Sequence, residues 1–122
     1  MVRIFTAPNR YIQGCGVLEN IGKYVSHLGR HFFILGGKSA LSSIRETVSK
    51  SMTANSMTCH FAVFTGKGTR SDANAMAKKA ADFGADVIVG AGGGLALDTA
   101  KAVAYEMDLP LVMVPTIAST DA

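Results

Sequence analysis

The order of hydrophobic and polar positions predicts a chain of alternating strands and helices. Short apolar runs are typical of strands buried on both faces, and they occur at 31–35, 58–64, 86–89 and 109–114. Apolar residues recur at a helical period in the segments between them, at 17–28, 39–53, 71–83 and 93–107. This alternation predicts an α/β fold, a doubly wound, mostly parallel, Rossmann-like sheet with helices on both faces.

Turn and cap residues set the expected ends of these elements. A strand over 2–7 is ended by Pro8 and Asn9, and a short return strand covers 11–13. Ser71 is the expected N-cap of the third helix, with Asp72 in its first turn. Gly29 and Gly84 are the expected C-caps of the first and third helices, and Ser39 is a candidate cap for the second.

Polar loops follow four of the expected strands and meet at one edge of the expected sheet. Each is rich in glycine or hydroxyl side chains, and they cover 36–39, 65–69, 91–94 and 116–121. Ligands of doubly wound sheets bind outside the carboxyl ends of the strands, so this edge is the candidate site. The chain stops directly after the last loop, and we interpret it as a fragment.

The stretch from Asp86 to Lys101 reads D-V-I-V-G-A-G-G-G-L-A-L-D-T-A-K, which is a strand, a glycine-rich turn and a helix. Glycines let the backbone approach a ligand closely, and a helix N-terminus attracts an anion. The spacing differs from the dinucleotide fingerprint G-x-G-x-x-G, because Leu95 stands where the last glycine would be. The pattern favours nucleotide or phosphate binding, and a tight turn without a ligand stays open as the alternative.

Composition and charge narrow the class of protein. The 122 residues are 48% hydrophobic with a net charge of +3 and a pI near 9.0, which suits one α/β domain over 1–122. The twelve basic residues are scattered, which argues against a nucleic-acid partner. Cys15 and Cys59 form no C-x-x-C pattern, and the chain shows neither a signal peptide nor a membrane span. We therefore expect a soluble, cytoplasmic protein.

Two other functions compete with a redox nucleotide site. Gly36–Ser39 has the G-K-S ending of a P-loop NTPase, although Phe32 stands where the motif needs its first glycine. A non-catalytic nucleotide-binding or assembly module is the other alternative. Local explanations exist as well: Asp98 can pair with Lys101, and Asp121 can be solvated.

Two segments carry a resemblance to a known family. They are G-G-G-L-A-L-D-T-A-K and L-P-L-V-M-V-P-T-I-A-S-T-D-A, and the opening R-I-F-T-A-P-N-R-Y-I-Q-G supports them. The chain resembles the first third of the iron-containing alcohol dehydrogenase and dehydroquinate synthase group, and within it the glycerol dehydrogenase branch. The resemblance implies that the parent protein oxidises glycerol or a related vicinal diol to a hydroxyketone with NAD.

The resemblance also implies roles for individual residues. The NAD pyrophosphate would lie on Gly93, Gly94, Leu95, Ala96, Leu97 and Asp98. Thr116, Ile117, Ala118 and Ser119 would line the nicotinamide side, and Asp121 would contact the polyol substrate. A divalent metal, with zinc expected, would be held by an Asp and two His of a following helical domain, so this chain supplies neither metal ligands nor catalytic residues. The full-length protein would be a homo-oligomer, and the chain alone would be inactive.

Two positions depart from the family pattern. Glycerol dehydrogenases usually carry G-D-K after the third strand, and their Asp holds the adenosine ribose, whereas this chain reads Gly36–Gly37–Lys38. The loss of that carboxylate predicts a weakened preference for NAD and some tolerance of NADP. Leu95 replaces the Lys or Ser common after the glycines, and the lost contact would cost about 1 kcal/mol of binding.

Overall fold

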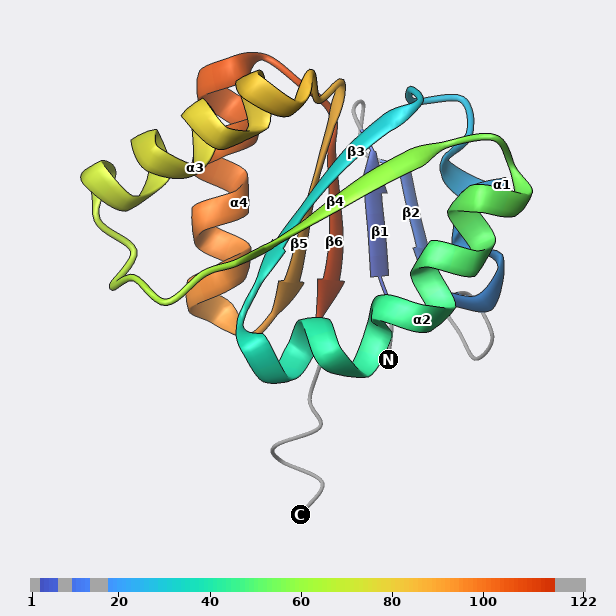
Figure 1. Ribbon diagram of the computed structural model, residues 1–122. Coiled ribbons are helices and arrows are strands. Elements are labelled where there is room, and N and C mark those ends of the chain that lie inside the picture. The colour runs from blue at the N-terminus through green and yellow to red at the C-terminus, as the bar shows by residue number, and fades with distance from the viewer. Residues whose placement is uncertain (1–2, 7–9, 14–17, 116–122) are drawn as a thin grey trace.

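The computed structural model describes residues 3–6, 10–13 and 18–115 (Figure 1). This part of the chain holds a β1–β2 hairpin, a short 3-10 turn, and then four helices that alternate with four further strands. They are β1 (Arg3–Thr6), β2 (Arg10–Gln13), the 3-10 turn η1 (Leu18–Asn20), α1 (Ile21–Val25), β3 (His31–Gly36), α2 (Lys38–Ala54), β4 (Thr58–Val63), α3 (Arg70–Phe83), β5 (Val87–Gly92), α4 (Gly94–Met107) and β6 (Leu111–Pro115). No helix in the described ranges is long and apolar enough to cross a membrane.

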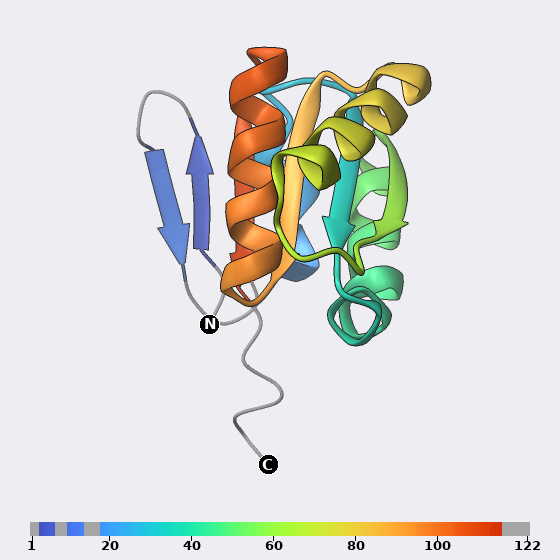
Figure 2. The ribbon, with the colours of Figure 1, turned by 90° about the vertical axis from the view of Figure 1, so that its left-hand side faces the viewer.

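Four parallel strands form the main sheet in the order β4-β3-β5-β6. Phe33 of β3 pairs with both His60 of β4 and Ile88 of β5, and Gly90 of β5 pairs with Met113 of β6. The chain steps outward from β3 to β4 and then returns past β3 to β5. The sheet therefore has its topological switch point between β3 and β5, which is where ligands of such sheets bind. The antiparallel β1–β2 hairpin forms a separate two-stranded sheet beside β6 (Figure 2).

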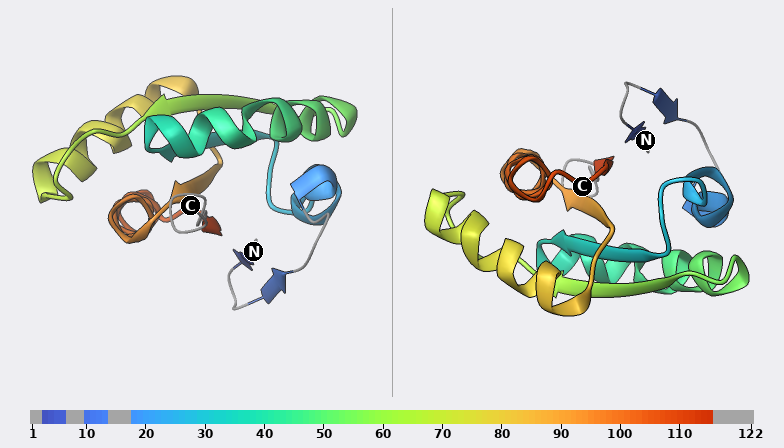
Figure 3. Two further views of the ribbon diagram at one scale, coloured as in Figure 1. Left: turned by 90° about the horizontal axis from the view of Figure 1, so that it is seen from below. Right: turned by 90° about the horizontal axis from the view of Figure 1, so that it is seen from above.

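The central strand β3 divides the core into two layers because its side chains alternate between the faces of the sheet. Phe32 and Ile34 pack into a cluster with α1 and α2. Phe33 and Leu35 pack into a second cluster with α3 and α4. A view along the strands shows these two pairs of helices on opposite sides of the sheet (Figure 3). The prediction of a doubly wound sheet with helices on both faces is confirmed.

Helix boundaries differ from the prediction at three places. The helix expected over 17–28 is only the η1 turn and the five residues of α1, whose C-cap is Ser26 rather than Gly29. Gly22 anchors this short helix to α2: its N–H donates to Ser51 Oγ (2.8 Å), and an added Cβ would lie 2.5 Å from Ser51 O. The short helix therefore packs closely against α2.

The second and third helices both begin before their expected caps. Gly37, not Ser39, is the N-cap of α2. Thr69, not Ser71, is the N-cap of α3, because its side chain accepts from the N–H of Asp72 and the Asp72 side chain accepts from the N–H of Thr69. At the other end Gly84 takes the left-handed conformation (φ +82°), so the predicted C-cap of α3 is confirmed.

Candidate functional site

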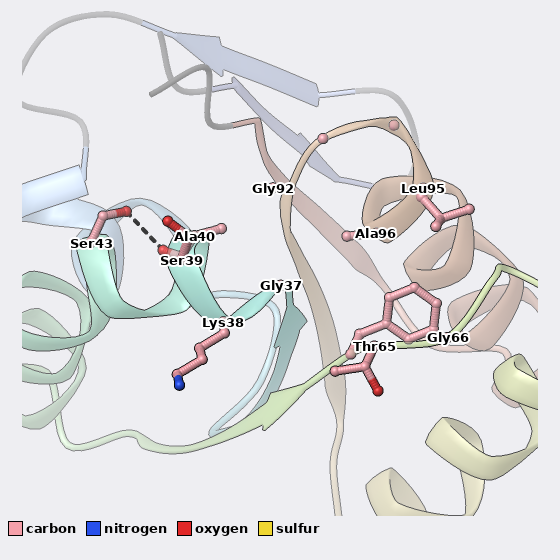
Figure 4. Close-up of a pocket in the computed structure, with 13 residues that line it drawn as sticks. Gly37, Lys38, Ser39, Ala40, Ser43, Thr65, Gly66, Gly92, Leu95 and Ala96 are labelled. Carbon is pink, nitrogen blue, oxygen red and sulfur yellow. Dashed lines mark hydrogen bonds between the residues drawn. The ribbon is translucent and has the colours of Figure 1, made fainter. Parts of the chain in front are cut away.

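A cavity of about 580 Å³ opens at the switch point between β3 and β5 (Figure 4). Three loops line it, those that follow β3, β4 and β5, together with the first turns of α2 and α4. The lining residues are Gly37, Lys38, Ser39, Ala40, Ser43, Phe64, Thr65, Gly66, Gly92, Gly93, Gly94, Leu95 and Ala96. Three of the four polar loops expected to converge at this edge therefore do so.

Two helix N-termini meet in this cavity, and neither is capped by a side chain. The N-caps are Gly37 for α2 and Gly93 for α4, both in extended conformation, and glycine has no side chain to accept a hydrogen bond. The first N–H groups of each helix have no acceptor within the helix. The first backbone bonds begin only at Leu41, which donates to Gly37 O, and at Leu97, which donates to Gly93 O (both 3.0 Å). The cavity thus presents two sets of free N–H donors and two positive dipole ends to an anion.

Helix α3 begins at the same edge of the sheet and provides the contrast. Its N-terminus carries the Thr69–Asp72 capping box, and the cap residue Thr69 does not line the cavity. Among these three helices, side-chain caps are absent where the N-terminus faces the cavity and present where it does not. The N-termini of α2 and α4 therefore keep their first N–H groups available to a ligand, whereas the capping box of α3 occupies donors of its own first turn.

The glycines around the cavity differ in what a side chain would meet. A Cβ added at Gly37, Gly93 or Gly94 would have no atom within 4 Å, so these three positions leave the backbone open toward the cavity. At Gly90 an added Cβ would lie 2.5 Å from Ala100 Cβ, which shows that this glycine lets α4 pack closely on β5. Gly92 has φ +131°, a conformation that other residues rarely adopt.

Among the described residues lining the cavity, Lys38 is the one with a charged side chain, and none is acidic. Lys38 is exposed and extends from the first turn of α2 (Figure 4). The Ser43 hydroxyl donates to Ala40 O (2.8 Å), whereas the exposed Ser39 and Thr65 hydroxyls remain beside the cavity. The electrostatics of the described lining are therefore those of an anion site with one exposed cation, Lys38.

The family of this chain is shown by its similarity to known proteins. The family model for iron-containing alcohol dehydrogenase matches residues 8–122, nearly the whole chain. The chain belongs to the iron-containing alcohol dehydrogenase family. It is 37% identical to a glycolaldehyde reductase of Halobacterium salinarum and 37% identical to a glycerol dehydrogenase of Escherichia coli O6:H1, in each case over 100% of this chain and 33% of the relative.

Solved structures agree with this assignment. The glycerol dehydrogenase of Schizosaccharomyces pombe superposes with a TM-score of 0.78 at 27% identity, covering 85% of this chain and 26% of the other. This chain of the iron-containing alcohol dehydrogenase family thus spans about a third of the length of the curated relatives it matches. The resemblance inferred from the sequence is confirmed for the family.

The family's expected pyrophosphate residues divide between two places in the structure. Gly93, Gly94, Leu95 and Ala96 line the cavity as predicted. Leu97 is half-buried and does not line it. Asp98 lines a separate groove of about 540 Å³ between α3 and α4. The remaining predicted contacts lie outside the described residues, namely Thr116, Ile117, Ala118, Ser119 and Asp121.

Sequence reasoning did not single out Phe64 or Ser43 as cavity residues. The loop 65–69 after β4 was expected at this edge, and Phe64 lies directly before that loop. The predicted alternation of strands and helices could therefore also have placed Phe64 at the cavity. Ser43 lies more than one turn into α2, and no local signal marks it. Within the described residues no group of three His, Cys, Asp or Glu side chains is placed to hold a metal ion.

Proposed function

We propose that this chain is the dinucleotide-binding part of an NAD-dependent polyol dehydrogenase, which oxidises glycerol or a related vicinal diol to a hydroxyketone. One observation carries the proposal: two uncapped helix N-termini meet in one cavity at the switch point of a sheet of the iron-containing alcohol dehydrogenase family. NAD brings its own chemistry, because its nicotinamide accepts the hydride.

The residues of this chain bind and orient that cofactor. The open backbone at Gly93 and Gly94 and the first turn of α4 would receive the pyrophosphate, since no Cβ there obstructs its approach. The N-terminus of α2 would receive the adenosine ribose. On the substrate side, Thr116 to Ser119 would face the nicotinamide and Asp121 the polyol, as the family resemblance implies.

The rest of the activity is assigned to parts of the protein beyond this chain. A divalent metal, for which we propose zinc, would polarise the substrate hydroxyl from ligands in the following domain. Residues 1–122 would therefore bind a dinucleotide without turnover, and the full-length protein would be a homo-oligomer.

The cavity also supports acceptance of NADP. Rossmann-type sites for NAD usually place a carboxylate at the ribose hydroxyls, whereas those for NADP place a cation near the 2′-phosphate. The described lining has no acidic side chain, and Lys38 stands beside Gly37 at the N-terminus of α2. We propose that both dinucleotides bind with comparable affinity.

A second candidate is the opposite direction of the same chemistry. The relative from Halobacterium salinarum, at 37% identity, carries the name glycolaldehyde reductase. Its match to this chain is as strong as that of the glycerol dehydrogenase from Escherichia coli. This supports reduction of a small hydroxyaldehyde as the alternative, with the same dinucleotide site supplying the hydride.

The test is a calorimetric titration of the purified chain with NAD, NADP and ATP in parallel. Saturable binding of a dinucleotide without comparable ATP binding supports the proposal, whereas ATP binding alone favours a P-loop NTPase. Incubation with glycerol, NAD and zinc should form no NADH. Turnover by the 122-residue chain would contradict the proposal that catalysis needs residues outside this chain. A full-length protein that binds NAD without turnover would favour the alternative of a non-catalytic nucleotide-binding module.

A further inference from the structure

The loop between β4 and α3 forms one wall of the cavity and is held by a carboxylate that lies outside it. Thr65 and Gly66 of this loop line the cavity, while Asp72 lies in the first turn of α3 and does not. We propose that Asp72 is a positioning residue for dinucleotide binding, because its carboxylate fixes the loop 65–69 in the shape of the cavity wall. The inference rests on the proposed function, since it assigns a role within that same cavity.

The hydrogen bonds converge on a single oxygen atom. Asp72 Oδ2 accepts from the backbone N–H groups of Lys67 (2.8 Å), Gly68 (3.0 Å) and Thr69 (3.2 Å). In return the N–H of Asp72 donates to Thr69 Oγ1 (3.1 Å). A capping box needs only the bonds between the cap and Asp72. The carboxylate also accepts from the N–H groups of Lys67 and Gly68, so it fixes the loop that precedes the helix as well as the helix end.

Two glycines allow the loop to lie against its neighbours. An added Cβ at Gly66 would lie 2.4 Å from Asp72 Cγ, so the backbone lies directly on the carboxylate. Gly68 has φ +81°, and an added Cβ there would lie 2.6 Å from Leu95 Cδ1 in the first turn of α4. The loop therefore joins Asp72 on one side to the helix turn proposed to hold the pyrophosphate on the other.

The near end of the loop is anchored independently of Asp72. The N–H of Phe64 donates to Gly36 O (2.7 Å), which ties the end of β4 to the end of β3. The N–H groups of Lys67, Gly68 and Thr69 donate to no backbone carbonyl among the described residues, and the Asp72 carboxylate accepts from them instead. Without that acceptor the three N–H groups would turn to water, and the loop would have to be ordered when the dinucleotide binds. Ordering a loop on binding lowers affinity.

The experiment separates this role from ordinary helix capping by comparing three variants. Asp72→Ala removes the acceptor of the loop N–H groups, and Thr69→Ala removes the cap hydroxyl but leaves that acceptor in place. Asp82→Ala removes an exposed carboxylate from the last turn of the same helix. We expect the Kd for NAD to rise about tenfold in Asp72→Ala and less than twofold in the other two variants.

Amide hydrogen exchange supplies the second readout. In the wild type and in Thr69→Ala the amides of Lys67 and Gly68 should be protected, and in Asp72→Ala they should exchange at the rate of an open loop. The amides of β3 and β5 should stay protected in all variants, which shows that the fold is intact.

Each outcome has a distinct meaning. An unchanged Kd in Asp72→Ala, or a Kd that rises equally in Thr69→Ala, overturns the positioning role while leaving the proposed function in place. Loop amides that remain protected in Asp72→Ala overturn it as well, whatever the Kd. If the wild-type chain binds no dinucleotide, the proposed function is contradicted, and so is the proposed role of Asp72 in positioning the loop.

Discussion

The substitution Gly37→Asp tests how the cavity selects its dinucleotide. Gly37 is the N-cap of α2 in extended conformation (φ −67°, ψ 158°), and an added Cβ would meet no atom within 4 Å. Asp is among the preferred N-cap residues, and exchanging it with Gly changes stability by only a few tenths of a kcal/mol, about 0.3. The variant should therefore fold as well as the wild type, and its effect should appear in binding.

The expected size follows from charge and hydrogen bonding. Two unit charges about 4 Å apart repel by about 1 kcal/mol in water and about 4 kcal/mol near a protein surface, so a carboxylate at position 37 weakens NADP binding by that range. The same carboxylate can accept hydrogen bonds from the ribose of NAD, each worth about 1.5 kcal/mol or more because it is charge-assisted. The weaker repulsion and one such hydrogen bond together make about 2.5 kcal/mol, so at about 1.4 kcal/mol per tenfold the ratio of Kd for NADP to Kd for NAD should rise at least about 60-fold.

Calorimetric titration of the wild type and the variant with both dinucleotides measures this ratio. Gly93→Asp is the matched control, because Gly93 is the other open N-cap of the same cavity. A carboxylate there would face the pyrophosphate that both cofactors share, so it should raise both Kd values and leave their ratio within about threefold. If Gly37→Asp changes the ratio by less than threefold, or if Gly93→Asp changes it as much, the placement of the ribose at α2 is wrong.

Three further predictions concern the same edge of the sheet. Gly94→Ala should stabilise α4 by about 0.5–1 kcal/mol, because Ala is the better helix former, and yet weaken NAD binding; a thermal melt paired with calorimetry checks both, and unchanged affinity would refute the contact. Gly90→Ala should destabilise the fold by about 1–3 kcal/mol in urea unfolding, because its Cβ would overlap Ala100, and a neutral result would contradict that packing. Hydrogen bonds from the backbone N–H of Thr69 and its neighbours lower the pKa of Asp72 below its ordinary value. Asp72 therefore stabilises the native state above its unfolded pKa of about 3.9, and the protection of the loop amides should be lost as pH falls from there through the lower native pKa; protection that persists in acid would count against this.

Parts of the candidate site were predictable because they depend on neighbours in sequence. The glycine turn before α4 follows a buried strand and precedes a helical pattern, so Gly93 and Gly94 were expected at this edge of the sheet, and both line the cavity. That local argument does not place Asp98, which lines the groove between α3 and α4 rather than the cavity. The direction of a side chain on a helix depends on which face packs against the sheet, and here Ala96 and Ala100 occupy that face.

By itself the sequence determined the fold class and the edge at which a ligand would bind. Apolar runs such as 31–35 and the C-cap Gly84 are local signals, since burial on both faces and a left-handed turn restrict the residues at each position. Only the tertiary structure decided which loops share a cavity and which helix ends stay uncapped within it. Gly37 and Gly93 are far apart in sequence and meet because β3 and β5 are neighbours in the sheet, and strand pairing is a long-range choice that no local pattern encodes.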